Sequence, residues 1–220
     1  MITETLTWLT DPINVTGPTG WLQLIGQHLM YTIITLAIAA AIALPIGLYV
    51  GHTGRLRSAA VLATGLTRAL PTLGLLTLFA LLAGIGLVAP VIALVVLAVP
   101  SILAGAYSGL ESVPRSTIDG ARAQGMTEMQ ILTQVEVPLG IELIIGGLRS
   151  AFMQVLATAM LAAYVGNGGL GKLIFLGMKT EDYPVMLAGS LLVIVLAILC
   201  DVILALVQRA ARPKGIARTA

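Results

Sequence analysis

Long apolar segments separated by short polar ones dominate the hydrophobic pattern of this chain. An α-helix needs about 20 mostly apolar residues to cross a membrane, and five segments approach that length. The predicted membrane spans are residues 23–50, 69–87, 90–110, 148–165 and 186–207. Two shorter stretches, 58–68 and 139–147, are predicted as cytoplasmic lead-ins to the second and fourth spans, and the first lead-in breaks before Pro71. The pattern therefore predicts an all-α bundle of five spans.

The polar segments divide the chain into an ordered set of regions. Residues 1–22 form a short polar arm, predicted to be extracellular, and residues 23–208 a single transmembrane domain. Within that domain, residues 112–138 are predicted as a cytoplasmic hairpin, and residues 209–220 as a cytoplasmic tail.

The basic residues are distributed unevenly between the two sides of this map. All 12 Lys and Arg residues except Lys172 and Lys179 fall in or beside the segments assigned to the cytoplasm. Cytoplasmic loops of membrane proteins carry an excess of Lys and Arg. The bias predicts an outside N-terminus and a cytoplasmic C-terminus, which requires an odd number of spans.

Composition agrees with a membrane protein, because 58% of the residues are hydrophobic and only 10% are charged. The net charge of +2 gives no reason to expect a nucleic-acid partner. The single cysteine, Cys200, lies in an apolar run and can form no disulfide within the chain. The spans hold almost no ionisable residues, whereas ion-coupled transporters use buried carboxylates or histidines. Any energy source is therefore expected outside this chain.

Asp201 is the exception inside the fifth span, and a lone carboxylate there is costly unless it is paired. An ion pair or hydrogen bond with Arg68 or Arg149 would tie the fifth span to the second or the fourth. The alternative is that Asp201 simply reaches the interfacial water.

A polar island, residues 119–138, separates the third and fourth spans. Two capping-box patterns, Ser116 with Asp119 and Thr127 with Gln130, predict two short helices. Between them, Gly125 suits a left-handed helix end. Pro138 is predicted to mark the turn into the next segment.

Five residues of this region recur at helical spacing and are predicted to form one small apolar face: Ile118, Ala121, Gly125, Met129 and Leu132. An amphipathic hairpin of this kind suits docking into the groove of a partner. The alternative is a hairpin that lies on the membrane or packs beneath its own bundle.

The same region resembles the EAA signature of ABC-importer permeases. That signature consists of an acid, two small residues, a glycine and a final aliphatic-x-aliphatic-Pro. Its positions are occupied here by Asp119, Gly120, Ala121, Gly125, Val135, Val137 and Pro138. Asp replaces the usual Glu, Gly the first Ala, and Val stands at both aliphatic positions. The resemblance implies that cytoplasmic ABC ATPase subunits dock on this hairpin.

The resemblance covers residues 28 to 208. Its motifs are RALPTLGLL (68–76), VEVPLG…GGLRSA (135–151) and AAYVGNGGLG (162–171), which look like those of osmoprotectant permeases for glycine betaine, carnitine and choline. Glu142 departs from that pattern, in which proline is common. Methionine-type permeases share the same motifs less closely, so methionine or another amino acid is the alternative solute.

The family implies further expectations about the assembly. The fold is that of a type I importer permease in the cell membrane. A second permease chain, identical or related, completes the pathway in the lipid bilayer, and an extracellular solute-binding protein delivers the solute. No cofactor is expected in this chain, because ATP is bound by the partner subunits. A membrane scaffold or channel that uses the hairpin for assembly is the alternative from a different class.

The predicted outer loop contains Gly166, Gly168, Gly169 and Gly171, whose G-x-G-x-x-G spacing imitates a dinucleotide fingerprint. That fingerprint requires a preceding strand and a following helix, whereas here a membrane span precedes it. The P-loop reading fails because Leu173 replaces the Ser or Thr that must follow the lysine. The glycines instead favour a tight turn near an outer gate, with an inert connection as the alternative.

No catalytic residue and no metal ligand emerges from the sequence. His28 and His52 lie at opposite ends of the first span, so they cannot share a metal ion. No serine stands in a G-x-S-x-G elbow, and a single buried aspartate excludes an aspartyl-type intramembrane protease. The chain is expected to be a transport pathway and not an enzyme.

Overall fold

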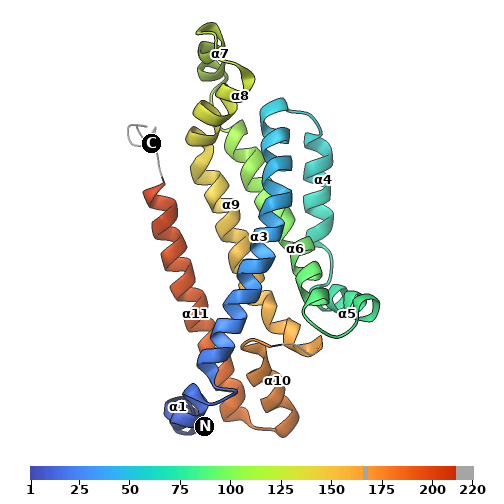
Figure 1. The fold of residues 1–220 in the computed structure, drawn as a ribbon, viewed down its shortest axis with the longest axis vertical. Helices are drawn as coiled ribbons and strands as arrows, with labels where there is room; N and C mark the ends of the chain where they lie inside the picture. The colour runs from blue at the N-terminus through green and yellow to red at the C-terminus, as the bar shows by residue number, and fades with distance from the viewer. Residues whose placement is uncertain (166–167, 212–220) are drawn as a thin grey trace.

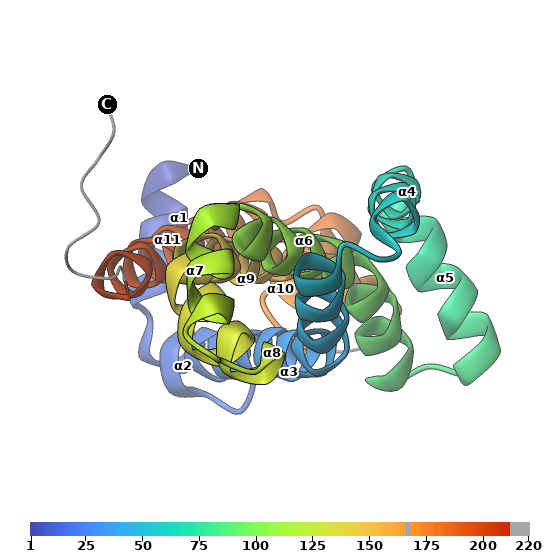
Figure 2. The same ribbon diagram turned by 90° about the horizontal axis from the view of Figure 1, so that it is seen from above.

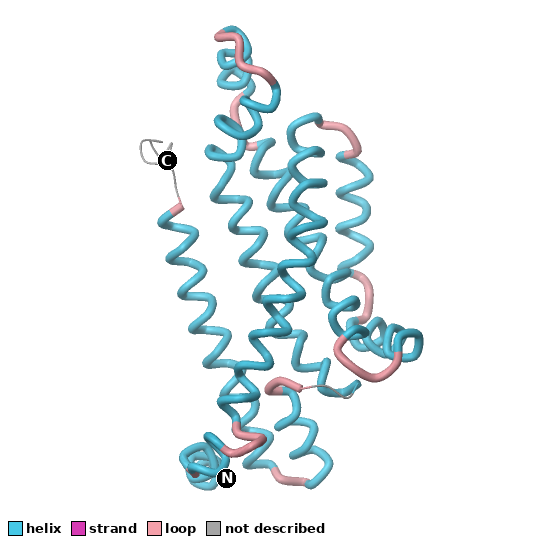
Figure 3. The backbone as a smooth tube through the Cα atoms, viewed as in Figure 1, coloured by secondary structure: helices cyan, strands magenta, loops and turns pink. Residues whose placement is uncertain are grey.

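The computed structural model describes residues 1–165 and 168–211, without the side chains of residues 67 and 68. All regular structure in this part of the chain is helical, and no strand occurs in it (Figure 3). The predicted all-α class is confirmed.

Four helical stretches of the described chain are long and apolar enough to cross a membrane. They contain α3 (Trp21–Thr53), α6 (Val88–Glu111), α9 (Val137–Thr158) and α11 (Tyr183–Ala210). All four run along the long axis of the molecule (Figure 1). Helices α3, α6 and α11 agree with the first, third and fifth predicted spans to within a few residues.

The second predicted span is not one long helix. It is replaced by α4 (Arg57–Arg68) and α5 (Thr72–Ala83), which meet at an extended Pro71. At 1.5 Å per residue each of these helices is about 18 Å long, which is too short to cross the roughly 30 Å hydrocarbon core alone. Helix α4 packs along α6, and Arg57 Nε lies 2.8 Å from Glu111 Oε1. Five full-length spans are therefore not confirmed.

The fourth predicted span starts earlier than expected. Residues 139–147, predicted as a lead-in, belong to α9 itself, and Pro138 lies inside a continuous helical stretch. A π-helical turn, η1 (Leu132–Glu136), precedes it, and the Val137 N–H donates to the Leu132 carbonyl five residues back. Because the wider turn adapts the backbone just before the residue that lacks an N–H, Pro138 does not end the helix. The predicted turn at Pro138 is wrong.

The bundle core lies where α3, α6 and α9 meet. Glycines bring α6 and α9 close together: a Cβ built on Gly105 would lie 2.6 Å from the Gly147 Cα atom. Small residues drive helix association in membranes by allowing this approach. Helix α11 packs against α9 and leaves much of its surface apolar and exposed.

The two ends of the bundle carry different structures (Figure 1). Helices α7 (Arg115–Ala123) and α8 (Glu128–Ile131) project from one end, which we term the hairpin end. Helices α1 (Ile2–Thr10), α2 (Pro12–Thr16) and α10 (Gly171–Thr180) form the opposite end, the loop end. The described chain starts at the loop end and finishes near the hairpin end.

The loop end is held to the bundle by specific contacts. The predicted polar arm is folded into α1 and α2, and the Thr5 hydroxyl donates to the Pro184 carbonyl at 3.3 Å. A 3₁₀ segment, η2 (Ala159–Val165), continues α9 towards α10, which packs against α11.

Candidate functional site

The hairpin is closed by turn chemistry that its sequence specifies. Gly125 has a φ of +82°, and its N–H donates to Arg122 while that of Met126 donates to Ala121. These two bonds form a Schellman cap that ends α7. Thr127 and Gln130 form a capping box at the start of α8, as predicted.

The other predicted capping box is wrong. Helix α7 begins at Arg115 after Pro114 and has no side-chain cap. Ser116 therefore already lies inside the helix and cannot serve as its N-cap. Pro114 has a non-helical backbone with a ψ of 134°, and α7 starts at Arg115, two residues before the Thr117 that a Ser116 cap would place first.

A small apolar core holds the hairpin together. Ile118 and Ala121 from the predicted face are buried with Val113 and Ile131. Met129 is 68% exposed, so its predicted place on that face is wrong. The chain leaves the helix at Gly125 and restarts at Glu128, and the helical spacing of α7 therefore does not continue into α8.

The residues that carry the EAA resemblance divide between surface and interior. Exposed residues are Asp119, Gly120, Gly125 and Pro138; Ala121 is buried, and Val135 and Val137 are half-buried. The exposed members lie on the surface of the hairpin. Ala121 and Val135 instead support the hairpin core.

Charged side chains cross the hairpin. Arg122 donates to both carboxylate oxygens of Glu128, at 2.7 and 2.9 Å, and to Asp119 at 3.4 Å. The hydrogen bond to Glu128 raises the pKa of Arg122 above its already high value. Asp119 and Arg122 both lie in α7, so within the described chain the acid of the resemblance makes no ion pair with α8 and reaches it only through Arg122.

Glu136 and His52 make a contact that the sequence did not predict. Glu136 is 2% exposed, and its Oε2 atom lies against Nδ1 of His52 in the last turn of α3. His52 Nε2 also lies 3.4 Å from Glu128 Oε2 on the hairpin surface. The imidazole thus joins α3 to both halves of the hairpin base. The feature of the sequence that could have indicated this contact is Glu136 itself, a charged residue that stands between two valines at positions 135–137.

At the loop end, glycines allow the predicted outer loop to lie flat against α3. The N–H of Gly169 donates to Gln27 Oε1 at 3.3 Å, and a Cβ at Gly168 would overlap the Gln27 carboxamide. A Cβ at Gly171 would overlap the Met160 carbonyl in η2. Gly166 lies outside the described residues.

Beside this loop, His28 is fully buried. Its Nε2–H donates to the Leu156 carbonyl at 2.9 Å, which links α3 to α9. The other ring nitrogen, Nδ1, has no partner within the described chain and lies under Gly169. The loop glycines thus rest on a buried polar side chain.

Replacing Gly169 with valine is expected to lower the free energy of unfolding by about 1–2 kcal/mol, the cost of a left-handed conformation for an L-residue. Gly169 has a φ of +86°, and a Cβ there would lie 3.0 Å from His28 Nδ1. Thermal unfolding of the purified chain in detergent measures the loss. Gly26→Ala is the matched control, because nothing lies within 4 Å of its Cβ position. Equal stability of both variants would contradict the packing described.

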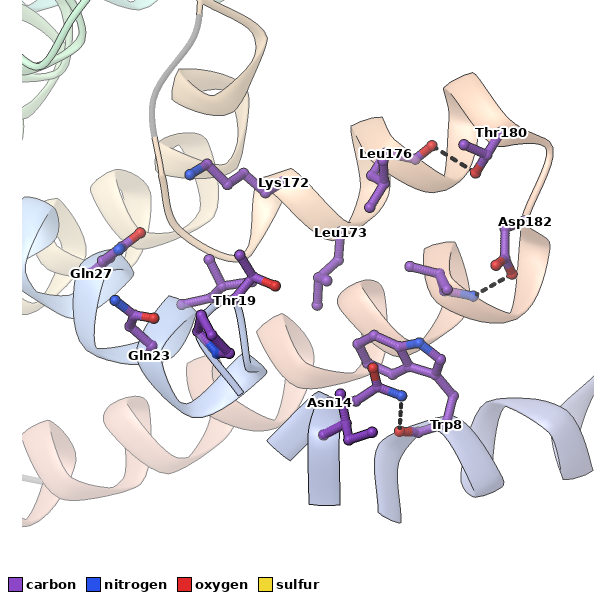
Figure 4. Close-up of a pocket in the computed structure, with 14 residues that line it drawn as sticks. Trp8, Asn14, Thr19, Gln23, Gln27, Lys172, Leu173, Leu176, Thr180 and Asp182 are labelled. Atoms are coloured by element: carbon purple, nitrogen blue, oxygen red, sulfur yellow. Dashed lines mark hydrogen bonds between the residues drawn. The ribbon is translucent and has the colours of Figure 1, made fainter. Parts of the chain in front are cut away.

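A cavity of about 660 Å³ opens at the loop end between the N-terminal arm, α3, α10 and α11. Gln23, Gln27 and Lys172 approach it from one side, and Trp8 and Asp182 from the other (Figure 4). Asp182 also caps α11 by accepting from the Val185 N–H at 3.2 Å. The cavity mixes polar and apolar walls and belongs to the same end as the glycine loop.

Asp201 is held by Arg149. The Nε and Nη2 atoms of Arg149 each donate to a different carboxylate oxygen at 2.8 Å, and Nη1 donates to Gln208 at 3.2 Å. Gln208 in turn donates to the Glu142 carbonyl. The fifth predicted span is therefore joined to the fourth by a bidentate ion pair. The side chain of Arg68, the other expected partner, lies outside the described part.

No group of three or more His, Cys, Asp or Glu side chains in the described chain is placed to hold a metal ion. Within the described residues, the hairpin network and the Arg149–Asp201 and Arg57–Glu111 pairs bring opposite charges together.

Comparison with known proteins gives one consistent picture. Residues 41–213 match the model of the family described as binding-protein-dependent transport system inner membrane component. The glycine betaine/carnitine/choline transport system permease protein OpuCB of Bacillus subtilis is 31% identical, over 87% of this chain and 88% of its own length. The carnitine transport permease protein OpuCD of Listeria monocytogenes is 30% identical over 96% and 94%.

A solved structure shows the same fold. An inward-facing MetNI methionine ABC transporter matches with a TM-score of 0.77 and 25% identity, covering 90% of this chain and 100% of that one. The curated relatives are transport permeases and not enzymes. The chain therefore belongs to the family of binding-protein-dependent transport system inner membrane components, and it is the multi-pass permease subunit of an ABC importer in the inner membrane.

Proposed function

We propose that this permease imports quaternary amine osmoprotectants such as glycine betaine, carnitine and choline. The observation that carries the proposal is the similarity, at about 30% identity over nearly the whole chain, to permeases named for those solutes. The osmoprotectant import permease protein OsmW of Salmonella typhimurium adds a relative at 31% identity. A methionine transporter shares the fold at 25% identity, which supports methionine as the second candidate.

ABC ATPase subunits supply the energy and bind the ATP, and a binding protein delivers the solute. The ATPases dock at the hairpin end, where α7 and α8 project beyond the bundle (Figure 1). The exposed Asp119, Gly120 and Gly125 contact them, and the movement passes to α3 and α9 through the hairpin base. Gly168, Gly169 and Gly171 contribute to an outer gate at the opposite end.

The topology follows from this assignment. The hairpin end is cytoplasmic and the N-terminal arm is outside. Helices α4 and α5 together supply the fifth crossing. Helix α4 runs along α6 from the hairpin end, and after Pro71 the chain turns into α5, which lies across the long axis (Figures 1 and 2). A second permease chain, identical or related, completes the path. A non-transporting scaffold finds no support among these relatives.

Uptake of radiolabelled glycine betaine, carnitine, choline and methionine by cells carrying the complete transporter tests the solute class. Uptake of at least one quaternary amine, abolished when the ATPase subunit is inactive, is expected. Uptake of methionine alone would assign the second candidate instead.

Replacing Gly125 with valine tests the docking surface. Its φ of +82° makes a β-branched residue strained by about 1–2 kcal/mol, which corresponds to roughly tenfold weaker ATPase association if the hairpin must keep this shape. Copurification of the ATPase subunit should fall while the thermal unfolding of the spans is unchanged. Gly84→Val is the matched control, because Gly84 at the end of α5 has the same φ of +82° and a Cβ there meets no atom within 4 Å. Full ATPase association of the Gly125→Val variant would count against docking at this turn.

A further inference from the structure

A polar surface runs along the bundle on α6, α9 and α11. Two cavities of about 380 Å³ each open on it, one between α6 and α9 and the other between α9 and α11. Gly146 and Ser150 line both cavities, so the two form one continuous groove across α9. Leu143, Gly146, Ser150 and Met153 follow each other at intervals of three and four residues, which places them on one face of α9.

The neighbouring helices add polar groups to the same groove. Ser101, Gly105 and Ser108 line it from α6, and the Ser101 hydroxyl donates to Gln154 on α9 at 3.1 Å. From α11 come Asp201 and Gln208, one either side of the Arg149 guanidinium. Viewed from the hairpin end, α6 and α9 lie between α11 on one side and α4 and α5 on the other (Figure 2).

This groove does not suit contact with lipid. The side chains of Arg149 and Asp201 are 30% and 40% exposed in the isolated chain, inside helices that cross the membrane. Charged residues at such depths face a bundle interior or a water-filled cavity. On α11, Leu199 precedes Asp201 by two residues, and at about 100° per residue the two side chains lie on opposite faces of the helix. Leu199 is 56% exposed, and other exposed apolar side chains surround it. The two sides of the same helix thus have the composition of a water-facing and a lipid-facing surface.

We infer that this groove is one wall of the aqueous solute path. The inference rests on the proposed function, because the opposite wall comes from the second permease chain. Among the residues that line the two cavities, the only charged groups are one acid and one base, and they neutralise each other. The remaining polar groups are hydroxyls and an amide, which can form hydrogen bonds with a hydrophilic solute in place of water.

The charge balance bears on how strongly the wall holds a solute. A wall with no net charge neither attracts nor repels a zwitterion or an ion as a whole. No aromatic ring lines either cavity, so the wall offers no cation–π cage and holds the solute only weakly. The groove is therefore a low-affinity passage, and selection among solutes lies outside this wall.

Reaction with a charged thiol reagent tests this wall. In a Cys200→Ala background, Ser150→Cys is compared with Leu199→Cys in the complete transporter in membrane vesicles, using a trimethylammonium-ethyl methanethiosulfonate. Because modification requires access of the thiolate to water, we expect the Ser150→Cys variant to react about tenfold faster or more. Excess glycine betaine should slow it. Equal rates for the two variants would overturn the inference.

A second position and a transport assay separate the possible failures. Ser101→Cys on α6 should react like Ser150→Cys, and copurification of the ATPase subunit shows that each variant is assembled. The labelling rate measures the access of water to the introduced cysteine, whichever solute the transporter carries. If the Cys200→Ala parent imported methionine alone, the proposed solute class would fail while the labelling still decided the wall. If the parent imported glycine betaine but both positions reacted like Leu199→Cys, only the wall would fail.

Discussion

Replacing His52 with leucine is expected to lower the free energy of unfolding by about 1–3 kcal/mol, the usual cost of leaving a buried hydrogen-bonding group without its partner. Glu136 is 2% exposed and contacts the His52 imidazole. The variant would leave that carboxylate in the interior of the hairpin base without a donor. Thermal and denaturant unfolding in detergent measure the loss, and ATPase copurification should fall with it.

The same imidazole supplies its own control. Glu128, 3.4 Å from the other ring nitrogen, has a side chain that is 55% exposed. Exposed pairs contribute about 0–1 kcal/mol, so Glu128→Gln, which also weakens the exposed pair with Arg122, should cost less than His52→Leu. The double variant His52→Leu/Glu136→Leu should recover most of the loss, since no buried polar group is then left without a partner. A His52→Leu variant as stable as the parent would show that Glu136 does not depend on this contact.

The functional meaning of the contact follows from its position. His52 ends α3, and Glu136 lies in the π-helical turn that leads into α9. Both helices extend from the hairpin end towards the loop end. Under the proposed function, a force applied to α7 and α8 would reach both long helices through this contact, and it could drive movement between inward- and outward-open states.

The long helices could be predicted because a continuous apolar run in lipid must form its backbone hydrogen bonds within itself, and an α-helix does this. Averaging over an apolar window, however, hides local breaks. The second predicted span contains Pro71 at one end and Gly84 and Gly86 at the other, and the structure ends α5 at these points. The first half of α9 was missed for the opposite reason, because Glu142 and several glycines lower its hydrophobicity without breaking the helix.

The site was predictable to the extent that it depends on local sequence. The left-handed Gly125 and the Thr127 capping box follow from turn chemistry within a few residues. The partner of Asp201 could be narrowed to Arg68 or Arg149, with interfacial water as the alternative, because isolated charges in apolar spans leave few possible partners; the structure selects Arg149. The contact between His52 and Glu136 depends on how far α3 and α9 are shifted relative to each other along the bundle axis. The pattern of polar and apolar residues does not specify that shift.

Replacing Arg149 with methionine is expected to lower the free energy of unfolding by about 2–3 kcal/mol, the cost of an unpaired aspartate within a membrane helix. The variant removes both donors to Asp201, which lie at 2.8 Å, and the bond to Gln208. Methionine retains much of the side-chain volume, so the loss reports on charge and hydrogen bonding and not on a cavity.

The double variant Arg149→Met/Asp201→Leu should regain stability, and Lys172→Met, which removes an exposed cation at the loop end, should lose none. Uptake separates the two roles of the pair: if it also serves the solute path, the stable double variant will still transport a zwitterion more slowly than the parent. A single Arg149→Met variant that unfolds at the parent temperature would show that water already solvates Asp201 and that the pair does not join α9 to α11.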